Sequence, residues 1–134
     1  MSTRCDIGIK TNNTAEIIYC HFDGYLSGVG KTLLENYTDL NKIEELISLG
    51  SISSLGKESN GSISHSHSNP DKDVTVAYMR DRGEKNQEAS VVDIDEVTDD
   101  MNDFMYLYDI EINKWIYCDY NNREFRELKI EDCI

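Results

Sequence analysis

The chain has 134 residues, a single proline and a formal net charge of −13 at pH 7. That length fits one domain, and a charge of this size and sign repels nucleic-acid backbones and anionic membrane surfaces. No apolar run reaches the roughly 20 residues that a membrane helix needs, and residues 1–10 carry charges where a signal peptide would be apolar. We therefore expect one cytoplasmic α+β domain over residues 1–134 that binds neither membranes nor nucleic acid directly.

Two apolar segments separated by a short polar stretch open the chain. Apolar residues alternate with polar ones or glycine over residues 5–10, and a second apolar run covers residues 15–22. The intervening residues 11–14 are turn formers, so the pattern predicts a β-hairpin.

Helical spacing follows the hairpin. Apolar residues recur at this spacing over residues 31–37 and again from Leu40 up to Gly50. Thr38 or Asp39 can cap the second helix. Two consecutive amphipathic helices are expected to lie on one face of a sheet.

The middle of the chain changes composition. Residues 51–72 are rich in Ser, Gly and His, which predicts a mobile surface loop. A strand is expected over residues 74–79 and a charged turn over residues 80–84. The acidic residues 91–103 favour a short helix.

The C-terminal part returns to strand periodicity. Residues 104–110 and 114–120 alternate around several aromatic side chains, among them Trp115, and predict a second hairpin. Residues 125–134 fit either a short strand or a terminal helix. The predicted architecture is an antiparallel sheet of about five strands with two consecutive helices on one face.

The cysteines and histidines do not predict a metal site. Cys5, Cys20, Cys118 and Cys133 are widely spaced and contain no C-x-x-C pair, so we expect reduced, structural thiols. His65 and His67 supply only two ligands within a serine-rich loop. We expect neither a metal nor a cofactor.

A glycine-rich stretch precedes the first helix and places Gly30, Lys31 and Thr32 where a phosphate-binding loop would lie. Residues 25–29 separate Gly24 from Gly30, one more than the four that a Walker A loop has. Nucleotide hydrolysis is therefore not expected. A non-catalytic anion site at the start of the helix stays open.

His21 and Asp23 lie at the end of the second predicted strand, where a base and an orienting carboxylate are conceivable. No nucleophile in a recognisable context accompanies them, so we predict no catalytic residues and a protein that is not an enzyme. An enzyme using His21 and Asp23 remains an alternative.

Two further groups of residues predict binding. An acidic band with no lysine or arginine in it would engage a partner with a basic surface by imitating nucleic acid. It contains Asp93, Asp95, Glu96, Asp99, Asp100 and Asp103. The alternative is a nucleotide site across a homodimer, made by Tyr19, His21, Asp23, Tyr25, Lys31, Arg80 and Arg82.

Several motifs carry a resemblance that covers most of the chain. Residues 19–25 read YCHFDGY, residues 28–31 GVGK, residues 33–37 LLENY and residues 78–84 YMRDRGE. This pattern resembles a family of small uncharacterised proteins of phages, prophages and other mobile elements. The family often has Trp where this chain has Phe22 and Pro where it has Leu26.

The resemblance implies a biological context. Small accessory proteins on mobile elements frequently counter host defence, either by binding a defence effector or by sequestering a nucleotide signal. We therefore expect an anti-CRISPR-like inhibitor that binds a nucleic-acid-binding defence effector stoichiometrically in the bacterial cytoplasm, with a nucleotide-binding protein as the alternative.

Overall fold

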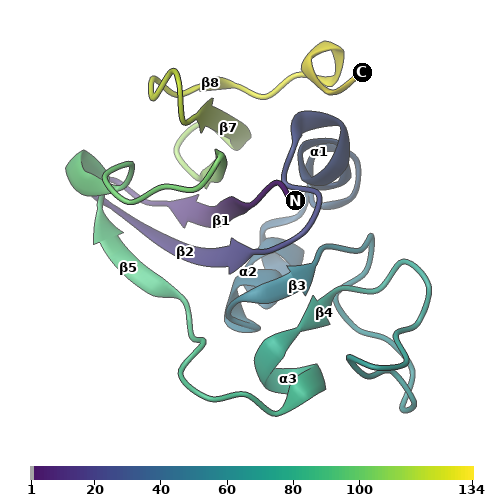
Figure 1. The fold of residues 1–134 in the computed structure, drawn as a ribbon. Helices are drawn as coiled ribbons and strands as arrows, with labels where there is room; N and C mark the ends of the chain where they lie inside the picture. The colour runs from purple at the N-terminus through teal and green to yellow at the C-terminus, as the bar shows by residue number, and fades with distance from the viewer. Residues whose placement is uncertain (1) are drawn as a thin grey trace.

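Eight strands form one sheet in the computed structural model, which describes residues 2–134 (Figure 1). The sheet order is β4-β3-β2-β1-β6-β7-β8, with β5 paired to β2 beside this path. The strands are β1 (Cys5–Lys10), β2 (Thr14–Cys20), β3 (Ile52–Ser54), β4 (Val76–Ala77), β5 (Ser90–Asp93), β6 (Phe104–Asp109), β7 (Lys114–Asp119) and β8 (Arg126–Glu127).

Three α-helices and three shorter helical turns complete the fold. The α-helices are α1 (Lys31–Asn36), α2 (Leu40–Ser48) and α3 (Tyr78–Arg82). A π-helix, η1 (Leu26–Gly30), runs directly into α1, and the 3-10 turns are η2 (Ile94–Glu96) and η3 (Ile130–Cys133). Figure 1 shows β7 and β8 at one end of the molecule and β3, β4 and α3 at the other.

Both predicted hairpins are present. Strands β1 and β2 pair antiparallel from Cys5 opposite Cys20, and β6 and β7 pair antiparallel from Phe104 opposite Asp119. Cross-strand aromatic pairs stabilise the second hairpin, since the rings of Tyr108 and Trp115 meet edge to face with centroids 5.4 Å apart.

The prediction of a purely antiparallel sheet of about five strands is wrong. Strand β1 pairs parallel with β6, with Cys5 opposite Phe104, and β2 pairs parallel with β3 through Cys20 and Ile52. The sheet is therefore mixed, and it contains three short strands, β3, β4 and β8, whose two or three residues are too few to show a period.

The two consecutive helices cover one face of the sheet, which we call the helix-covered face. Side chains from alternate strand positions, such as Ile7 and Ile18, form one buried cluster with Leu33 of α1 and with Ile43 and Leu46 of α2. The Asp39 side chain, one of the two caps that the sequence allowed, caps α2 by accepting a hydrogen bond from the Asn41 N–H at 3.4 Å.

The opposite face, called here the second face, carries a smaller buried cluster. Met105 and Leu107 of β6 and Ala15 of β2 pack there against Val97 and Met101, from the segment that follows β5. The segment of residues 93–103 therefore lies across the second face of the sheet, and its apolar side chains hold it there.

The region between α2 and β5 differs from the prediction. The strand expected over residues 74–79 is shorter than predicted and consists of β4 alone. Helix α3 begins at Tyr78 and takes the place of most of the charged turn that was expected over residues 80–84. Gly83 ends α3 with a φ of 74°, the left-handed conformation that glycine adopts without steric cost.

Candidate functional site

The acidic segment, residues 93–103, exposes every carboxylate singled out from the sequence. Buried Val97 and Met101 hold this segment on the second face, and the acidic residues between and beside them face solvent. The exposed acids are Asp93, Asp95, Glu96, Asp99, Asp100 and Asp103. Apolar anchors and outward carboxylates thus alternate along one short stretch of chain.

Little positive charge offsets this segment. Within residues 2–134, none of its carboxylates forms an ion pair, whereas Asp109, just beyond it, pairs with Lys10 at 3.6 Å. Arg123 reaches the segment only through a hydrogen bond from Nη1 to the Thr98 carbonyl at 3.2 Å. Within residues 2–134, the carboxylates of this segment therefore carry negative charge that no ion pair offsets.

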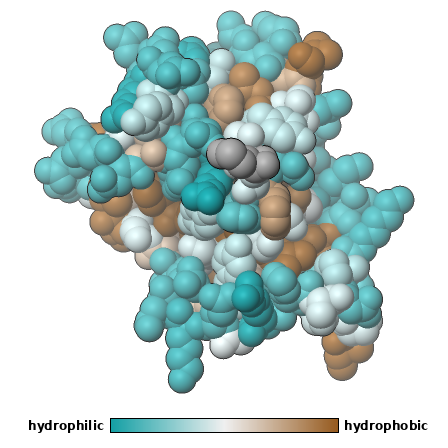
Figure 2. Space-filling model, viewed as in Figure 1, coloured by the Kyte–Doolittle hydropathy of each residue, from teal (hydrophilic) through white to brown (hydrophobic). Residues whose placement is uncertain are grey.

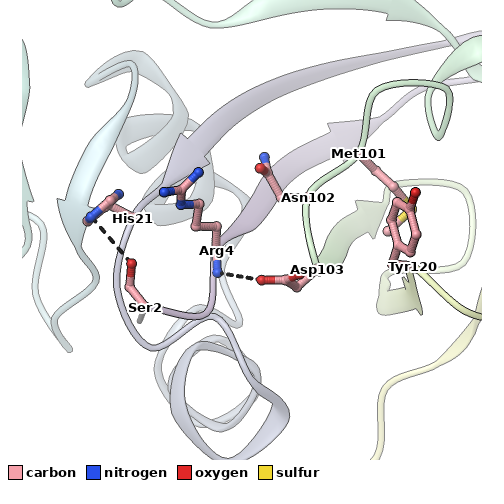
Figure 3. Close-up of a pocket in the computed structure, with 7 residues that line it drawn as sticks. All are labelled: Ser2, Arg4, His21, Met101, Asn102, Asp103 and Tyr120. Atoms are coloured by element: carbon pink, nitrogen blue, oxygen red, sulfur yellow. Dashed lines mark hydrogen bonds between the residues drawn. The ribbon is translucent and has the colours of Figure 1, made fainter.

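A polar cavity of about 460 Å³ borders one end of the acidic segment (Figure 3). Its lining comes from the chain before β1, from the end of β2, from the end of the acidic segment and from the residue after β7. The lining residues are Ser2, Arg4, His21, Met101, Asn102, Asp103 and Tyr120. Of these, only His21 and Asp103 were singled out from the sequence.

His21 pairs with Tyr19 rather than with Asp23. The Tyr19 hydroxyl lies 2.7 Å from His21 Nδ1, which leaves Nε2 directed toward Ser2 Oγ at 3.4 Å. Asp23 instead accepts a hydrogen bond from the Tyr25 hydroxyl at 3.3 Å, and its negative charge raises the pKa of Tyr25. The base and orienting carboxylate that the sequence suggested are not in contact.

The chain is already helical before Lys31, so α1 does not begin with free backbone N–H groups at this residue. The preceding residues already form η1, and the Lys31 N–H donates to the carbonyls of Gly28 and Leu26. These amides are thus used within the helical segment and do not point at an anion. Lys31 also begins a helix on the helix-covered face, whereas Tyr19 lies on the second face, because it alternates with buried Ile18 and Cys20.

Every donor of the Arg80 guanidinium is engaged by the protein, and its side chain is 29% exposed. Its Nε and Nη2 donate to Asp81 at 2.8 and 2.9 Å, and Nη2 also donates to the Thr75 carbonyl at 2.8 Å. Its Nη1 donates to the Ser59 carbonyl at 2.5 Å and to Asn60 Oδ1 at 3.2 Å. These bonds occupy all five N–H donors of a guanidinium. Arg80 therefore clamps residues 59–60 to α3.

The other groups of this region are also engaged. His65 Nδ1 accepts a hydrogen bond from the Asp71 N–H at 2.9 Å, and Nε2 lies 3.2 Å from Asp81. Arg82 pairs with Glu84 at 3.1 Å. Arg80 and His65 line a separate cavity of about 220 Å³, so the seven residues proposed for a nucleotide site are not gathered in one place.

Sequence reasoning missed Ser2, Arg4, Met101, Asn102 and Tyr120 as members of the cavity. No motif marks them, because only the parallel pairing of β1 with β6 brings residues 2–4 beside residues 101–103. Arg4 carries the one available signal, since it is a basic residue directly before a strand in a very acidic chain.

The fold and surface define an acidic α+β protein with a mixed sheet. Comparison with known proteins finds no family model, no curated protein and no solved structure that matches the chain. Over the described residues 2–134, no group of three or more His, Cys, Asp or Glu side chains is placed to hold a metal ion. No helix in that part of the chain has the length and apolar character to cross a bilayer.

Proposed function

We propose that this protein inhibits a bacterial antiviral defence stoichiometrically, by placing its acidic segment on the basic nucleic-acid-binding surface of a defence effector. The observation that carries the proposal is the exposure of six carboxylates on one anchored segment without an ion pair within residues 2–134: Asp93, Asp95, Glu96, Asp99, Asp100 and Asp103.

The way the segment is held supports a binding role. Residues that only increase solubility can lie anywhere on the surface, but these acids are presented by a stretch whose apolar side chains Val97 and Met101 are buried. A fixed row of negative charge loses little conformational entropy on binding. It also accelerates association with a basic surface through electrostatic steering.

The overall charge supports the same class of partner. A formal charge of −13 opposes binding to nucleic acid. The same charge favours a partner protein whose basic surface normally binds nucleic acid. Hydrophilic residues cover much of the face seen in Figure 2, with smaller hydrophobic patches between them. The defence context comes from the resemblance to phage and prophage proteins.

The proposal is tested with purified RNA-guided nucleases, chosen because their channels bind nucleic acid through backbone contacts. We expect the protein to bind one such effector in an equimolar complex and to prevent its binding of target DNA. The association rate should fall steeply as salt rises from 50 to 500 mM. Failure to inhibit any effector of the panel at low salt would contradict the proposal.

Two variants with the same change in net charge separate the acidic segment from general acidity. One replaces the six acids of the segment with Asn or Gln. The other replaces six exposed glutamates elsewhere with Gln: Glu16, Glu35, Glu44, Glu88, Glu124 and Glu131. Only the first should lose inhibition, and equal loss in both would show that the location of the charge is irrelevant.

A further inference from the structure

The cavity beside the acidic segment contains an arginine whose guanidinium has no partner among residues 2–134. The backbone of Arg4 is fixed, because its N–H donates to Asp103 Oδ2 at 3.1 Å and its carbonyl accepts from the Asp103 N–H at 3.1 Å. The side chain itself makes no hydrogen bond or ion pair with the described residues, and it lines the cavity. A cation held at its base and free at its tip is suited to bind an anion.

His21 adds a second polar group at the same end. The Tyr19 hydroxyl engages Nδ1 at 2.7 Å and fixes the ring, while Nε2 faces the cavity near Ser2 Oγ. Arg4 lines the same cavity, and Figure 3 shows its guanidinium on the side where His21 lies. Arg4 and His21 therefore lie close enough to act on one anionic group.

The middle of the cavity offers acceptors rather than donors. Asp103 uses Oδ2 on the Arg4 backbone, and its other oxygen is left to accept a hydrogen bond from a ligand hydroxyl. Asn102 is occupied behind the cavity wall, where its backbone N–H and side-chain amide donate to Asp6 at 3.0 and 2.9 Å. Burial raises the pKa of Asp6, and the two hydrogen bonds from Asn102 oppose that rise.

An aromatic ring closes the other end. Tyr120 follows β7, is 58% exposed and holds the Arg123 guanidinium over its ring at 4.6 Å from the centroid. Met101 lies beside it in Figure 3, so this end of the cavity is less polar. A flat ring of a ligand can stack on such a side chain.

We propose that this cavity binds a nucleoside monophosphate. Figure 3 shows His21 and Arg4 at one end, Asp103 in the middle and Tyr120 at the far end, which is the order that a phosphate, a ribose and a base require. Carboxylates commonly bind ribose hydroxyls, and a cavity of about 460 Å³ is within the range of small-ligand sites. This site does not depend on the proposed inhibition of a defence effector.

The test uses the isolated full chain and isothermal titration calorimetry at low salt. The probes are AMP, GMP, CMP and UMP, with adenosine, ribose 5-phosphate and inorganic phosphate as comparators. We expect at least one monophosphate to bind at least tenfold more tightly than all three comparators. Absence of binding by every monophosphate, or equal binding of inorganic phosphate, would overturn the proposal.

Matched variants assign the binding to the cavity. Arg4→Gln removes the unpartnered cation and should weaken monophosphate binding at least tenfold, whereas Lys114→Gln removes one positive charge at the other end of β7, about 20 Å from Tyr120. Tyr120→Ala should reduce the monophosphate affinity to that of ribose 5-phosphate. Equal losses in Arg4→Gln and Lys114→Gln, with both variants folded by circular dichroism, would show that the cavity is not the site.

Discussion

Arg80 and Asp81 are consecutive residues whose side chains are joined by two hydrogen bonds, from Nε to Oδ1 at 2.8 Å and from Nη2 to Oδ2 at 2.9 Å. The same carboxylate accepts the Ala77 N–H at 2.8 Å and lies 3.2 Å from His65 Nε2. The side chain of Asp81 is only 3% exposed. One buried carboxylate thus connects β4, α3 and the serine-rich segment.

Replacement of Asp81 by Asn is expected to destabilise the protein by about 2 kcal/mol, because it removes the charge of a buried carboxylate that accepts hydrogen bonds from the partly exposed Arg80 guanidinium and from the Ala77 N–H. Chemical denaturation measures this loss. Arg82→Ala is the control, since its pair with Glu84 is solvent-exposed and should contribute less than about 1 kcal/mol. A similar small effect in both variants would contradict the role assigned to Asp81.

Acid should remove the contribution of Asp81. Burial alone would raise the pKa of Asp81, but hydrogen bonds from Arg80 and from the Ala77 N–H outweigh it and the pKa is lowered. The native state therefore binds this proton less readily than the unfolded chain. The stabilisation is present above the unfolded pKa of about 3.9 and is lost as pH falls through the native value.

This linkage predicts how the Asp81→Asn variant compares with the wild type at different pH values. The difference in free energy of unfolding should be largest near pH 6 and should shrink progressively below about pH 4. Urea denaturation at pH 6, 4 and 3 measures it. A difference that stays constant down to pH 3 would show that the charge of Asp81 does not stabilise the fold.

The contacts of Asp81 belong to the part of the structure that the sequence could not predict. Both hairpins, α2 and the Asp39 cap depend on local periods and on one short-range hydrogen bond, so they were predictable. The parallel contact between Cys5 and Phe104 was not, because residues that far apart leave no periodic signal. The brevity of β3, β4 and β8 likewise gives no period to read.

The candidate site likewise has a part that the sequence predicted and a part that it did not. The acidic segment was visible because its residues are consecutive in the chain. The cavity was not, because Arg4 and Tyr120 meet only through the sheet order. Arg80 was expected to bind a ligand, but composition cannot reveal that Ser59 and Thr75 supply carbonyl acceptors for it.

Gly8→Ala should disrupt the centre of the sheet. A Cβ at this position would lie 2.5 Å from the Glu16 carbonyl oxygen and 2.5 Å from Ile17 Cγ2. The carbonyl cannot retreat without loosening the pairing of β1 with β2, so we expect a destabilisation of about 2 kcal/mol or more. Thermal denaturation provides the measurement.

Gly83→Asn is the matched control for that substitution. Nothing lies within 4 Å of a Cβ at Gly83, and its φ of 74° is a conformation that Asn tolerates. The variant should lose less than about 1 kcal/mol. If Gly8→Ala were equally mild, the close approach of β1 and β2 would not be a constraint.

Neutralising five acids of the acidic segment, Asp93, Asp95, Glu96, Asp99 and Asp100, should not destabilise the fold; Asp103 is kept because its carboxylate accepts the Arg4 N–H. None of them forms an ion pair within residues 2–134, and reducing a net charge of −13 relieves repulsion. The melting temperature at low salt should stay the same or rise. A lower melting temperature would indicate a structural role for these carboxylates and would weaken the inference that they serve binding.

The thiols should be nearly inert in the folded protein. Cys5, Cys20, Cys118 and Cys133 are free and buried, and burial raises the pKa of Cys5 well above its usual value and that of Cys118 to about 11. Because the thiolate is the reactive form, DTNB should label the native protein slowly and all four thiols at once in urea. Cys133 lies in η3, near the exposed C-terminal Ile134, so it should react first, and Cys133→Ser should remove the earliest phase. Rapid labelling of several thiols in native buffer would show that the core opens far more often than its packing implies.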